Sequence, residues 1–243
     1  MEMTEKNPLE AGTEVSVVIP VKDDSAALAV CLAALRAQSR PADEIIVVDN
    51  ASTDNSAAIA AAGGAKVLDC PEPGIPAASS RGYDAAAGDL ILRLDADCTP
   101  APSWIDHVVT AFHEQPRISA LTGSGRFTDG PVLLRTPLAL TYLCAYTVVS
   151  TAALGHRPLF GSNFAMRREA WQAIRATVHR ADPELHDDLD LSFHIGEHYR
   201  VGHMRSPAMG ISMRPFRSVG SFRHRIRRVF ALLLPTGPVT FPH

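Results

Sequence analysis

Two carboxylates follow directly after an apolar run. Asp95 and Asp97 come after residues 90–94, with only Ala96 between them. Two acids at the end of a buried strand repel each other unless a cation lies close to both. Carboxylate oxygens are hard ligands that suit Mg²⁺ or Mn²⁺, and these ions also bind phosphate oxygens. The pattern predicts a divalent metal beside a phosphate ligand; a polar turn at the strand end is the alternative.

Other acids occupy equivalent places along the chain. Asp23 follows the apolar run at 15–20, and Asp49 ends the run at 44–49. Ligands of parallel sheets collect at the carboxyl ends of the strands. We therefore expect Asp23, Asp49 and Asp95 to line one edge of a sheet.

Strand and helix patterns alternate through the first half of the chain. Helical spacing of apolar residues separates the strand patterns, and Ser25 is the expected N-cap of the first helix. The expected strands are 15–20, 44–49, 66–68 and 89–94, and the expected helices are 25–38, 52–62 and 79–87. This alternation predicts an α/β fold with a mostly parallel central sheet flanked by helices.

Residues 136–155 carry no charge and are about long enough to span a bilayer. Seven hydroxyl-bearing residues dilute the hydrophobicity of this segment. Spanning would also separate Asp95 and Asp97 from the acids at 187–190. We expect a buried or interfacial helix in preference to a transmembrane one.

The net charge of −3 gives no reason to expect nucleic acid as a partner. The charge is uneven, however, because Glu197 is the last acid and eight arginines follow it. Residues 214–234 mix arginines with apolar residues, as in an amphipathic helix that contacts a membrane surface or a partner. The alternative is a closing helix that packs on the domain with its arginines in solvent. The first interpretation implies a lipid-linked or membrane-proximal acceptor.

The four cysteines are widely spaced and form no Cys-x-x-Cys pair, which argues against a zinc site and a disulfide framework. The histidines at 194, 198, 203 and 224 are interpreted as surface or packing residues. Residues 1–14 contain no apolar run, so we expect no signal peptide and a cytoplasmic protein, peripheral to a membrane if the tail binds one.

Four segments in order, 17–24, 44–54, 86–97 and 186–191, resemble the family 2 glycosyltransferases of GT-A fold. The resemblance covers residues 15–213. It implies a Rossmann-like half at 13–125 that binds a nucleotide-sugar, an acceptor-binding half at 126–213, and the basic tail at 214–243. The implied activity is a metal-dependent transfer of one sugar, of hexosyltransferase type, from a nucleotide-diphosphate sugar to a hydroxyl, with inversion.

The resemblance also implies a role for particular residues. Asp188 would be the catalytic base, Asp97 would hold Mg²⁺ or Mn²⁺, and Asp187 stands where Glu is usual. The residues implied to bind the nucleotide-sugar are Pro20, Val21, Asp23, Asp24, Asp49, Asn50, Ser52, Asp54, Asp95, Ala96, Gly161 and Asn163.

Some features depart from the family pattern or admit other interpretations. Ser79 and Ser80 stand where family members often carry Arg-Asn. The Gln-x-x-Arg-Trp motif of processive synthases is absent after Leu191, which favours transfer of a single sugar. The acids at 187–188 are also what a helix N-terminus favours. A non-catalytic nucleotide-binding module stays open as an alternative. A sugar nucleotidyltransferase ranks lower, because residues 20–23 lack a glycine-rich loop.

Overall fold

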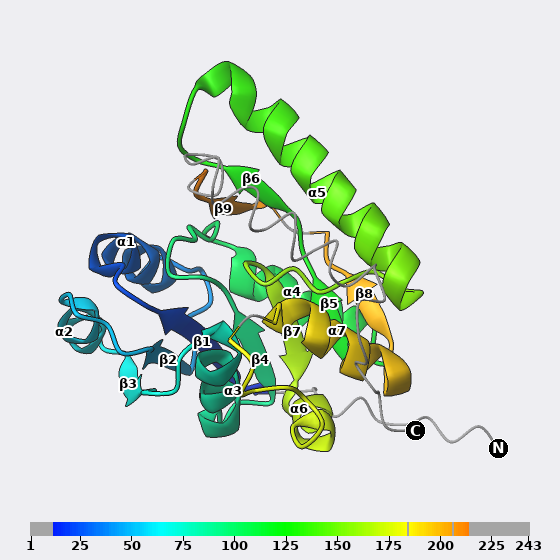
Figure 1. Ribbon diagram of the computed structural model, residues 1–243, viewed down its shortest axis with the longest axis horizontal. Helices are drawn as coiled ribbons and strands as arrows, with labels where there is room; N and C mark the ends of the chain where they lie inside the picture. Colours follow the sequence, from blue (N-terminus) through cyan, green and yellow to red (C-terminus); the bar gives the residue numbers. More distant parts are fainter. Residues whose placement is uncertain (1–11, 184, 206, 214–243) are drawn as a thin grey trace.

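A seven-stranded sheet with helices on both faces organises the protein (Figure 1). The computed structural model describes residues 12–183, 185–205 and 207–213. The predicted basic tail at 214–243 lies outside the described residues. The strand order is β3-β2-β1-β4-β7-β5-β8, and a second sheet pairs β6 with β9.

The α/β prediction with a mostly parallel sheet is confirmed. β1, β2, β3 and β4 pair in parallel, and β7 runs antiparallel between β4 and β5. The strands are β1 Val15–Val21, β2 Glu44–Asp49, β3 Lys66–Asp69, β4 Leu90–Arg93, β5 Ala120–Thr122, β6 Gly125–Phe127, β7 Phe164–Arg167, β8 Val201–His203 and β9 Met209–Ile211.

The two faces of the sheet bury two separate apolar cores. Val17 and Ile19 of β1 face a core built with α1, α2 and α4, whereas Val18 faces one built with α3, α6 and α7. The alternation follows from the period of two along a strand. The helices are α1 Ser25–Arg36, α2 Ser56–Ala62, α3 Ile75–Ala85, α4 Trp104–Glu114, α5 Val132–Leu154, α6 Arg168–Ile174 and α7 Asp187–His198.

Two predicted helix starts and one predicted N-cap differ in the structure, although α1 itself begins at Ser25 as expected. Asp24, not Ser25, precedes α1, and α2 begins at Ser56 because residues 52–55 form a loop that bonds to its neighbour. The helix α3 begins at Ile75, where Pro76 fits the first turn, so that Ser79 lies inside this helix rather than at its start.

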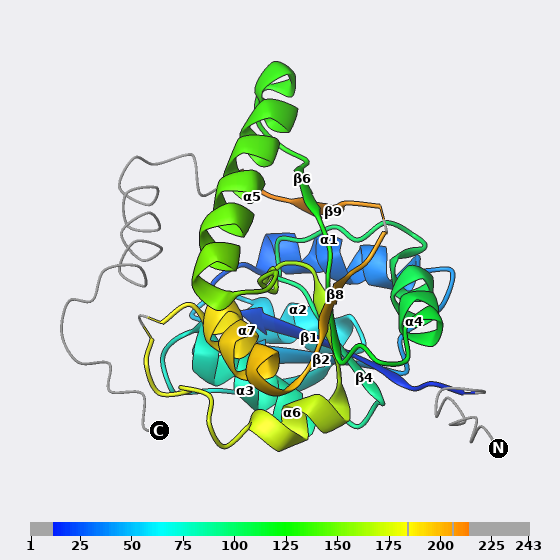
Figure 2. The same cartoon turned by 90° about the vertical axis from the view of Figure 1, so that its right-hand side faces the viewer.

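The helix α5 packs on β6 and α7 and stands out from the sheet (Figures 1 and 2). Helix formation over the uncharged segment is confirmed. Of the two expectations for this helix, buried or interfacial, full burial does not hold for its outer face, where Leu133, Leu140 and Val148 are 89%, 59% and 67% exposed. Among the described residues, no helix is both long and apolar enough to cross a bilayer.

The antiparallel β7 brings the second half of the chain to the site. Arg93 at the end of β4 pairs with Phe164 at the start of β7. The loop that precedes β7 therefore reaches the same edge as the carboxyl ends of β1, β2 and β4. The N-terminus of α7 lies at the same edge, where Asp187 contacts Arg93.

Candidate active site

The loops after β1 and β2 bind each other. Asp23 Oδ1 accepts hydrogen bonds from the backbone N–H (2.6 Å) and hydroxyl (3.0 Å) of Thr53, while Ser52 Oγ accepts one from Asp23 N–H at 3.0 Å. Asp54 accepts a hydrogen bond from the backbone of Ser25 at 2.9 Å. Hydrogen bonds to Thr53 lower the pKa of Asp23, and those from Ser56 and Ser25 lower the pKa of Asp54 to about 2. Both carboxylates are therefore ionised and fix the shape of the two loops.

Asp23 adopts a positive φ of 49°, which is uncommon outside glycine. The strained backbone persists because Thr53 and Ser52 hold Asp23 from the opposite loop. Behind it, Pro20 and Val21 are buried in β1. Asp24 donates its backbone N–H to Ser56 Oγ at 3.2 Å. These four predicted residues therefore lie together at the end of β1.

Asp49 and Asn50 end β2 beside these loops. Asp49 Oδ1 accepts the backbone N–H of Ser52 at 3.1 Å. The side chain of Asn50 donates to the carbonyls of Cys70 and Glu72 and accepts the N–H of Gly74. Asn50 thus fastens the loop between β3 and α3.

A buried arginine lies at the end of β4. Arg93 is 2% exposed, and its Nη2 lies 3.0 Å from Asp95 Oδ1 and 3.4 Å from Asp187 Oδ2. Burial disfavours a charged guanidinium, but the carboxylates of Asp95 and Asp187 outweigh that cost and raise the pKa of Arg93. A permanent positive charge therefore joins the Asp95 loop to the N-terminus of α7.

The pKa of Asp187 is shifted strongly by the surroundings of this residue. Burial raises the pKa of Asp187 to about 6, although Arg93 acts in the opposite direction. Ser79 of α3 donates a hydrogen bond to Asp187 Oδ2 at 3.1 Å. Where family members often carry Arg-Asn, this chain therefore has Ser79, which donates its hydroxyl to Asp187. The cation beside Asp187 is Arg93 of β4.

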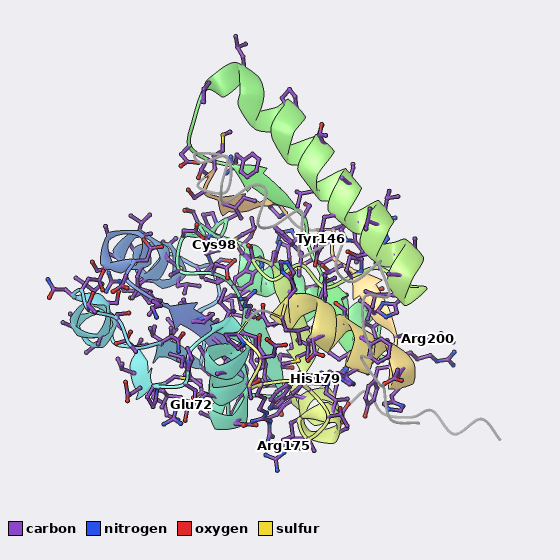
Figure 3. The ribbon with its side chains drawn as sticks, viewed as in Figure 1. Glu72, Cys98, Tyr146, Arg175, His179 and Arg200 are labelled. Carbon is purple, nitrogen blue, oxygen red and sulfur yellow. The ribbon has the colours of Figure 1, made fainter. Side chains whose placement is uncertain are left out.

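One oxygen of Asp188 is held by hydrogen bonds, whereas the other is buried and has no hydrogen-bond partner among the described residues. Its Oδ2 accepts hydrogen bonds from the hydroxyl of Tyr146 at 3.0 Å and from the backbone N–H of Gly161 at 3.2 Å. Its Oδ1 makes no hydrogen bond with the residues that the structure describes. Tyr146 extends from α5 toward the body of the protein (Figure 3), and its single hydroxyl hydrogen is shared with the carbonyl of Leu159, which lies at the same 3.0 Å. The base predicted from the motif is thus oriented by two donors, and its other oxygen remains able to accept a proton.

The acids predicted to bind a metal lie together. Ligand atoms of Asp95, Asp97 and Cys98 are within 4.8 Å of one another. Both oxygens of Asp95 are engaged, Oδ1 with Arg93 and Oδ2 with the hydroxyl of Ser162 at 2.6 Å. Burial raises the pKa of the Cys98 thiol, so this sulfur is protonated, and a neutral thiol is a poor ligand for a hard ion. Mg²⁺ or Mn²⁺ fits this donor set through Asp97, with Asp95 fixed beside it and Ala96 buried between them.

The loop before β7 carries Gly161 and Asn163, two of the residues predicted to bind the nucleotide-sugar. Gly161 is close to the ion pair, since a Cβ there would lie 2.1 Å from Arg93 Nη1. Asn163 is fully buried and bonds to Trp104 and to the carbonyl of Ser124. Asn163 therefore anchors the loop to Trp104 and Ser124. Its contact with the nucleotide-sugar stays a prediction.

The predicted residues form two groups on one edge: the β1 and β2 loops, and the cluster around Arg93. Sequence interpretation gave no role to Arg93 or Tyr146. Arg93 carried a signal, because a charge inside the apolar run at 90–94 requires a buried counter-ion. Tyr146 carried none, since it lies in an uncharged helix far along the chain.

The comparisons with known proteins agree with this geometry. The model of the family described as glycosyl transferase family 2 matches residues 16–175, and the chain belongs to this family. An uncharacterized glycosyltransferase of Mycobacterium tuberculosis is 40% identical over 87 residues, which cover 36% of this chain and 38% of that protein. Glucosyl-3-phosphoglycerate synthase of Mycolicibacterium paratuberculosis is 28% identical over 156 residues, or 52% of this chain and 47% of that protein. The matched stretches thus span less than half of these relatives.

Solved structures extend the likeness to most of the fold. Glucosyl-3-phosphoglycerate synthase of Mycobacterium tuberculosis in complex with phosphoglyceric acid has a TM-score of 0.65 and 20% identity, covering 92% of this chain and 81% of that one. The same enzyme with Mn²⁺, uridine diphosphate and glucosyl-3-phosphoglycerate has a TM-score of 0.61 and 23% identity, covering 93% and 80%. At this identity the likeness establishes the shared GT-A architecture.

Proposed function

We propose that this protein transfers one hexosyl group from a nucleoside-diphosphate sugar to an acceptor hydroxyl, with inversion at the anomeric carbon. The observation that carries the proposal is the state of Asp188. Tyr146 and Gly161 hold one of its oxygens, and the other makes no hydrogen bond with the described residues. A carboxylate held in this way suits a general base.

The chemical step follows from that arrangement. The acceptor oxygen attacks the anomeric carbon while its proton passes to Asp188 Oδ1. The bond from the anomeric carbon to the diphosphate breaks on the opposite side, and the electron pair leaves with the diphosphate oxygen. A single displacement of this kind inverts the anomeric centre.

The donor side is assigned to the other carboxylates. Asp97 would hold Mg²⁺ or Mn²⁺ against the diphosphate, and the bound ion would neutralise the charge that develops on the leaving group. Arg93 and Ser162 fix Asp95 so that it faces the sugar-nucleotide. The loops carrying Asp23 and Asp49 would receive the nucleoside.

The relatives suggest which ligands to test first. One structure of the synthase from Mycobacterium tuberculosis is a complex with Mn²⁺, uridine diphosphate and phosphoglyceric acid. We propose a uridine-diphosphate sugar as the first donor and a small hydroxyl acceptor that bears a phosphate as the first acceptor. In this proposal residues 13–125 bind the donor and residues 126–213 bind the acceptor.

The test begins with thermal shifts for nucleoside diphosphates and their sugars, each with and without Mn²⁺. A ligand that binds the native state raises its apparent stability, so the correct donor should stand out. Donor turnover is then measured in Asp97→Asn, Asp188→Asn and the exposed control Glu114→Gln. We expect Asp188→Asn to keep the donor-induced shift and to lose about 10²- to 10⁴-fold in transfer rate. Transfer at the wild-type rate in Asp188→Asn would refute the assignment of the base.

A non-catalytic nucleotide-binding module is the second candidate, and the absence of Arg-Asn at Ser79 and Ser80 favours it. This candidate predicts a metal-dependent thermal shift with uridine diphosphate but no sugar transfer from any donor. The presence of Asp188 between its two hydrogen-bond donors argues for the enzyme.

A further inference from the structure

A second group of metal-ligating side chains lies on the opposite side of α7 from Asp188. His179 comes from the loop between α6 and α7, while Asp190 and His194 are one turn apart on α7. Ligand atoms of these three residues all lie within 4.8 Å of one another. His179 Nδ1 is 2.7 Å from Asp190 Oδ1, and His194 Nε2 is 3.5 Å from the same oxygen. Two imidazole nitrogens and a carboxylate oxygen thus converge on one point.

His194 supplies an independent indication of a ligand. This residue is 8% exposed, and its Nε2 makes no hydrogen bond with the residues that the structure describes. A buried nitrogen without a hydrogen bond costs free energy comparable to a lost bond. The interpretation of His194 as a packing residue accounts for its burial and leaves this nitrogen unexplained.

Neighbouring groups are placed as they are around bound metals. Glu197 Oε2 lies 3.7 Å from Nδ1 of His194, on the side of the ring opposite the cluster. The backbone N–H of His179 donates to Asp190 Oδ2 at 2.9 Å and leaves Oδ1 directed at the two rings. A carboxylate behind a ligating histidine and a hydrogen bond to a ligating carboxylate are common features of metal sites.

We propose that His179, Asp190 and His194 bind one divalent transition-metal ion, preferentially Zn²⁺. Zinc takes imidazole and carboxylate ligands at about 2.0–2.2 Å, so tetrahedral ligand atoms lie about 3.3 Å apart. The 3.5 Å between His194 Nε2 and Asp190 Oδ1 already meets this requirement. The 2.7 Å between His179 Nδ1 and Asp190 Oδ1 must lengthen by about 0.6 Å. The mixed nitrogen and oxygen donors differ from the carboxylates at Asp95 and Asp97, which suit a hard ion.

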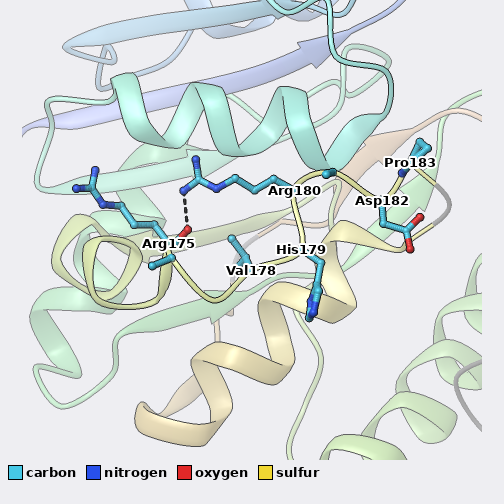
Figure 4. A pocket seen from close by; sticks show the side chains of 8 residues that line it. Arg175, Val178, His179, Arg180, Asp182 and Pro183 are labelled. Carbon is cyan, nitrogen blue, oxygen red and sulfur yellow. Dashed lines mark hydrogen bonds between the residues drawn. The ribbon is translucent and has the colours of Figure 1, made fainter. Parts of the chain in front are cut away.

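Solvent reaches this site through His179, whose side chain is 51% exposed. His179 lines a shallow pocket of about 780 Å³ formed by the loop after α6, together with Arg175, Val178, Arg180, Asp182 and Pro183 (Figure 4). His179 and Asp190 also line a narrow cavity of about 20 Å³ that reaches Ser79 and Asp187. The metal would therefore enter from the surface and have room for water as a further ligand.

The ion would couple this loop to the catalytic helix. Without it, the described contacts of His179 with Asp190 are a hydrogen bond from the ring and one from the backbone. With the ion bound, His179 is joined to α7 through both Asp190 and His194. Asp190 is only two residues from Asp188. The site is thus structural and holds the pocket wall against the helix that carries the base.

The test measures Zn²⁺ binding by titration calorimetry on full-length protein that has been stripped with a chelator. Asp97→Asn serves as the background, so that the site near Asp95 does not add to the count. We expect one Zn²⁺ per chain in this background and a higher melting temperature with Zn²⁺ than without it. Replacing Zn²⁺ by Co²⁺ should give the intense visible absorption of a tetrahedral Co²⁺ ion.

His179→Ala is the informative variant, because this side chain is half exposed and its loss should not prevent folding. We expect its Zn²⁺ affinity to fall by more than the roughly 10–100-fold typical of losing an outer-shell partner. His198→Ala, an exposed histidine on the same helix, is the matched control and should bind as the background does. Equal Zn²⁺ affinity in His179→Ala and His198→Ala, or no binding in the background, would overturn the proposal. Since no donor or acceptor is present, neither outcome depends on the proposed transferase activity.

Discussion

Arg93 Nη2 lies 3.4 Å from Asp187 Oδ2, and this contact joins the strand that leads to Asp95 with the helix that carries Asp188. The two residues are distant in the sequence, yet Arg93 is almost fully buried between the two halves of the site. The carboxylates of both halves therefore share one cation. Their mutual repulsion is reduced before any ligand binds.

Removing this cation should destabilise the protein. Arg93→Met leaves Asp187, whose side chain is 16% exposed, and Asp95, which is 34% exposed, without their common partner. Breaking a buried ion pair on one side costs at most about 3–5 kcal/mol, and solvent around Asp95 reduces this cost. Urea denaturation should show this loss, whereas the exposed control Arg81→Met should stay within about 0.5 kcal/mol of wild type. Adding Asp187→Asn to Arg93→Met should recover part of the loss. No recovery in the double variant would mean that Asp187 is not the partner that matters.

The stability of the protein should depend on the protonation of Asp187. Its folded-state pKa of about 6 is above the ordinary value, so the folded protein holds this proton more tightly than the unfolded chain does. Stability should therefore fall as pH rises from about 4 to about 6, by up to about 3 kcal/mol. Denaturation midpoints across this range should show a smaller fall in Asp187→Asn. An identical pH dependence in the variant would contradict the raised pKa.

Tyr146 should affect turnover more than binding. Tyr146→Phe removes the hydroxyl that donates to Asp188, and a hydrogen bond to a charged group contributes about 1.5–3 kcal/mol. We expect kcat to fall by roughly 10–100-fold, which is the same energy expressed as a rate, with the KM for the donor nearly unchanged. The control is Tyr199→Phe at the far end of α7. An equal fall in kcat in both variants would show that the effect is not specific to Asp188.

Gly161 should not tolerate a methyl group. In Gly161→Ala the new Cβ would lie 2.1 Å from Arg93 Nη1 and 3.2 Å from Asp188 Oδ2, and the buried arginine has little room to move. Overpacking of this kind costs about 1–3 kcal/mol and should displace the ion pair, with loss of activity.

The control for that variant is Gly64→Ala. Gly64 has φ +79° and nothing within 4 Å of the added Cβ, so only backbone strain of about 1–2 kcal/mol is expected, with activity unchanged. Full activity in Gly161→Ala would show that the contact at Arg93 is not required.

The parallel half of the fold could be predicted because its signals are local. Uninterrupted apolar runs mark β1, β2 and β4, and helical spacing marks α1 between them. The boundaries of α2 and α3 could not be predicted in this way. Residues 52–55 bond to the neighbouring loop rather than start a helix, and this depends on Asp23, which lies 29 residues before Ser52.

The placement of Asp95, Asp97 and Asp188 beside one another at the candidate site could be predicted from the motifs, and their roles stay predictions. The partners of those residues depend on tertiary structure. Tyr146 meets Asp188 only because α5 packs beside α7, and no spacing along the chain encodes that contact. Asn163 was assigned to the ligand because it stands in the right loop, whereas its side chain faces Trp104.

The loop before β7 has a consequence for attempts to change specificity. The backbone of Gly161 bonds to Asp188, the hydroxyl of Ser162 bonds to Asp95, and the side chain of Asn163 bonds to Trp104 and Ser124. An insertion here would break at least one of these bonds, so directed evolution has little freedom in this segment. Residues 175–183 line an open pocket and include several exposed positions. A library designed to accept new acceptors is better placed there, with His179 left unchanged.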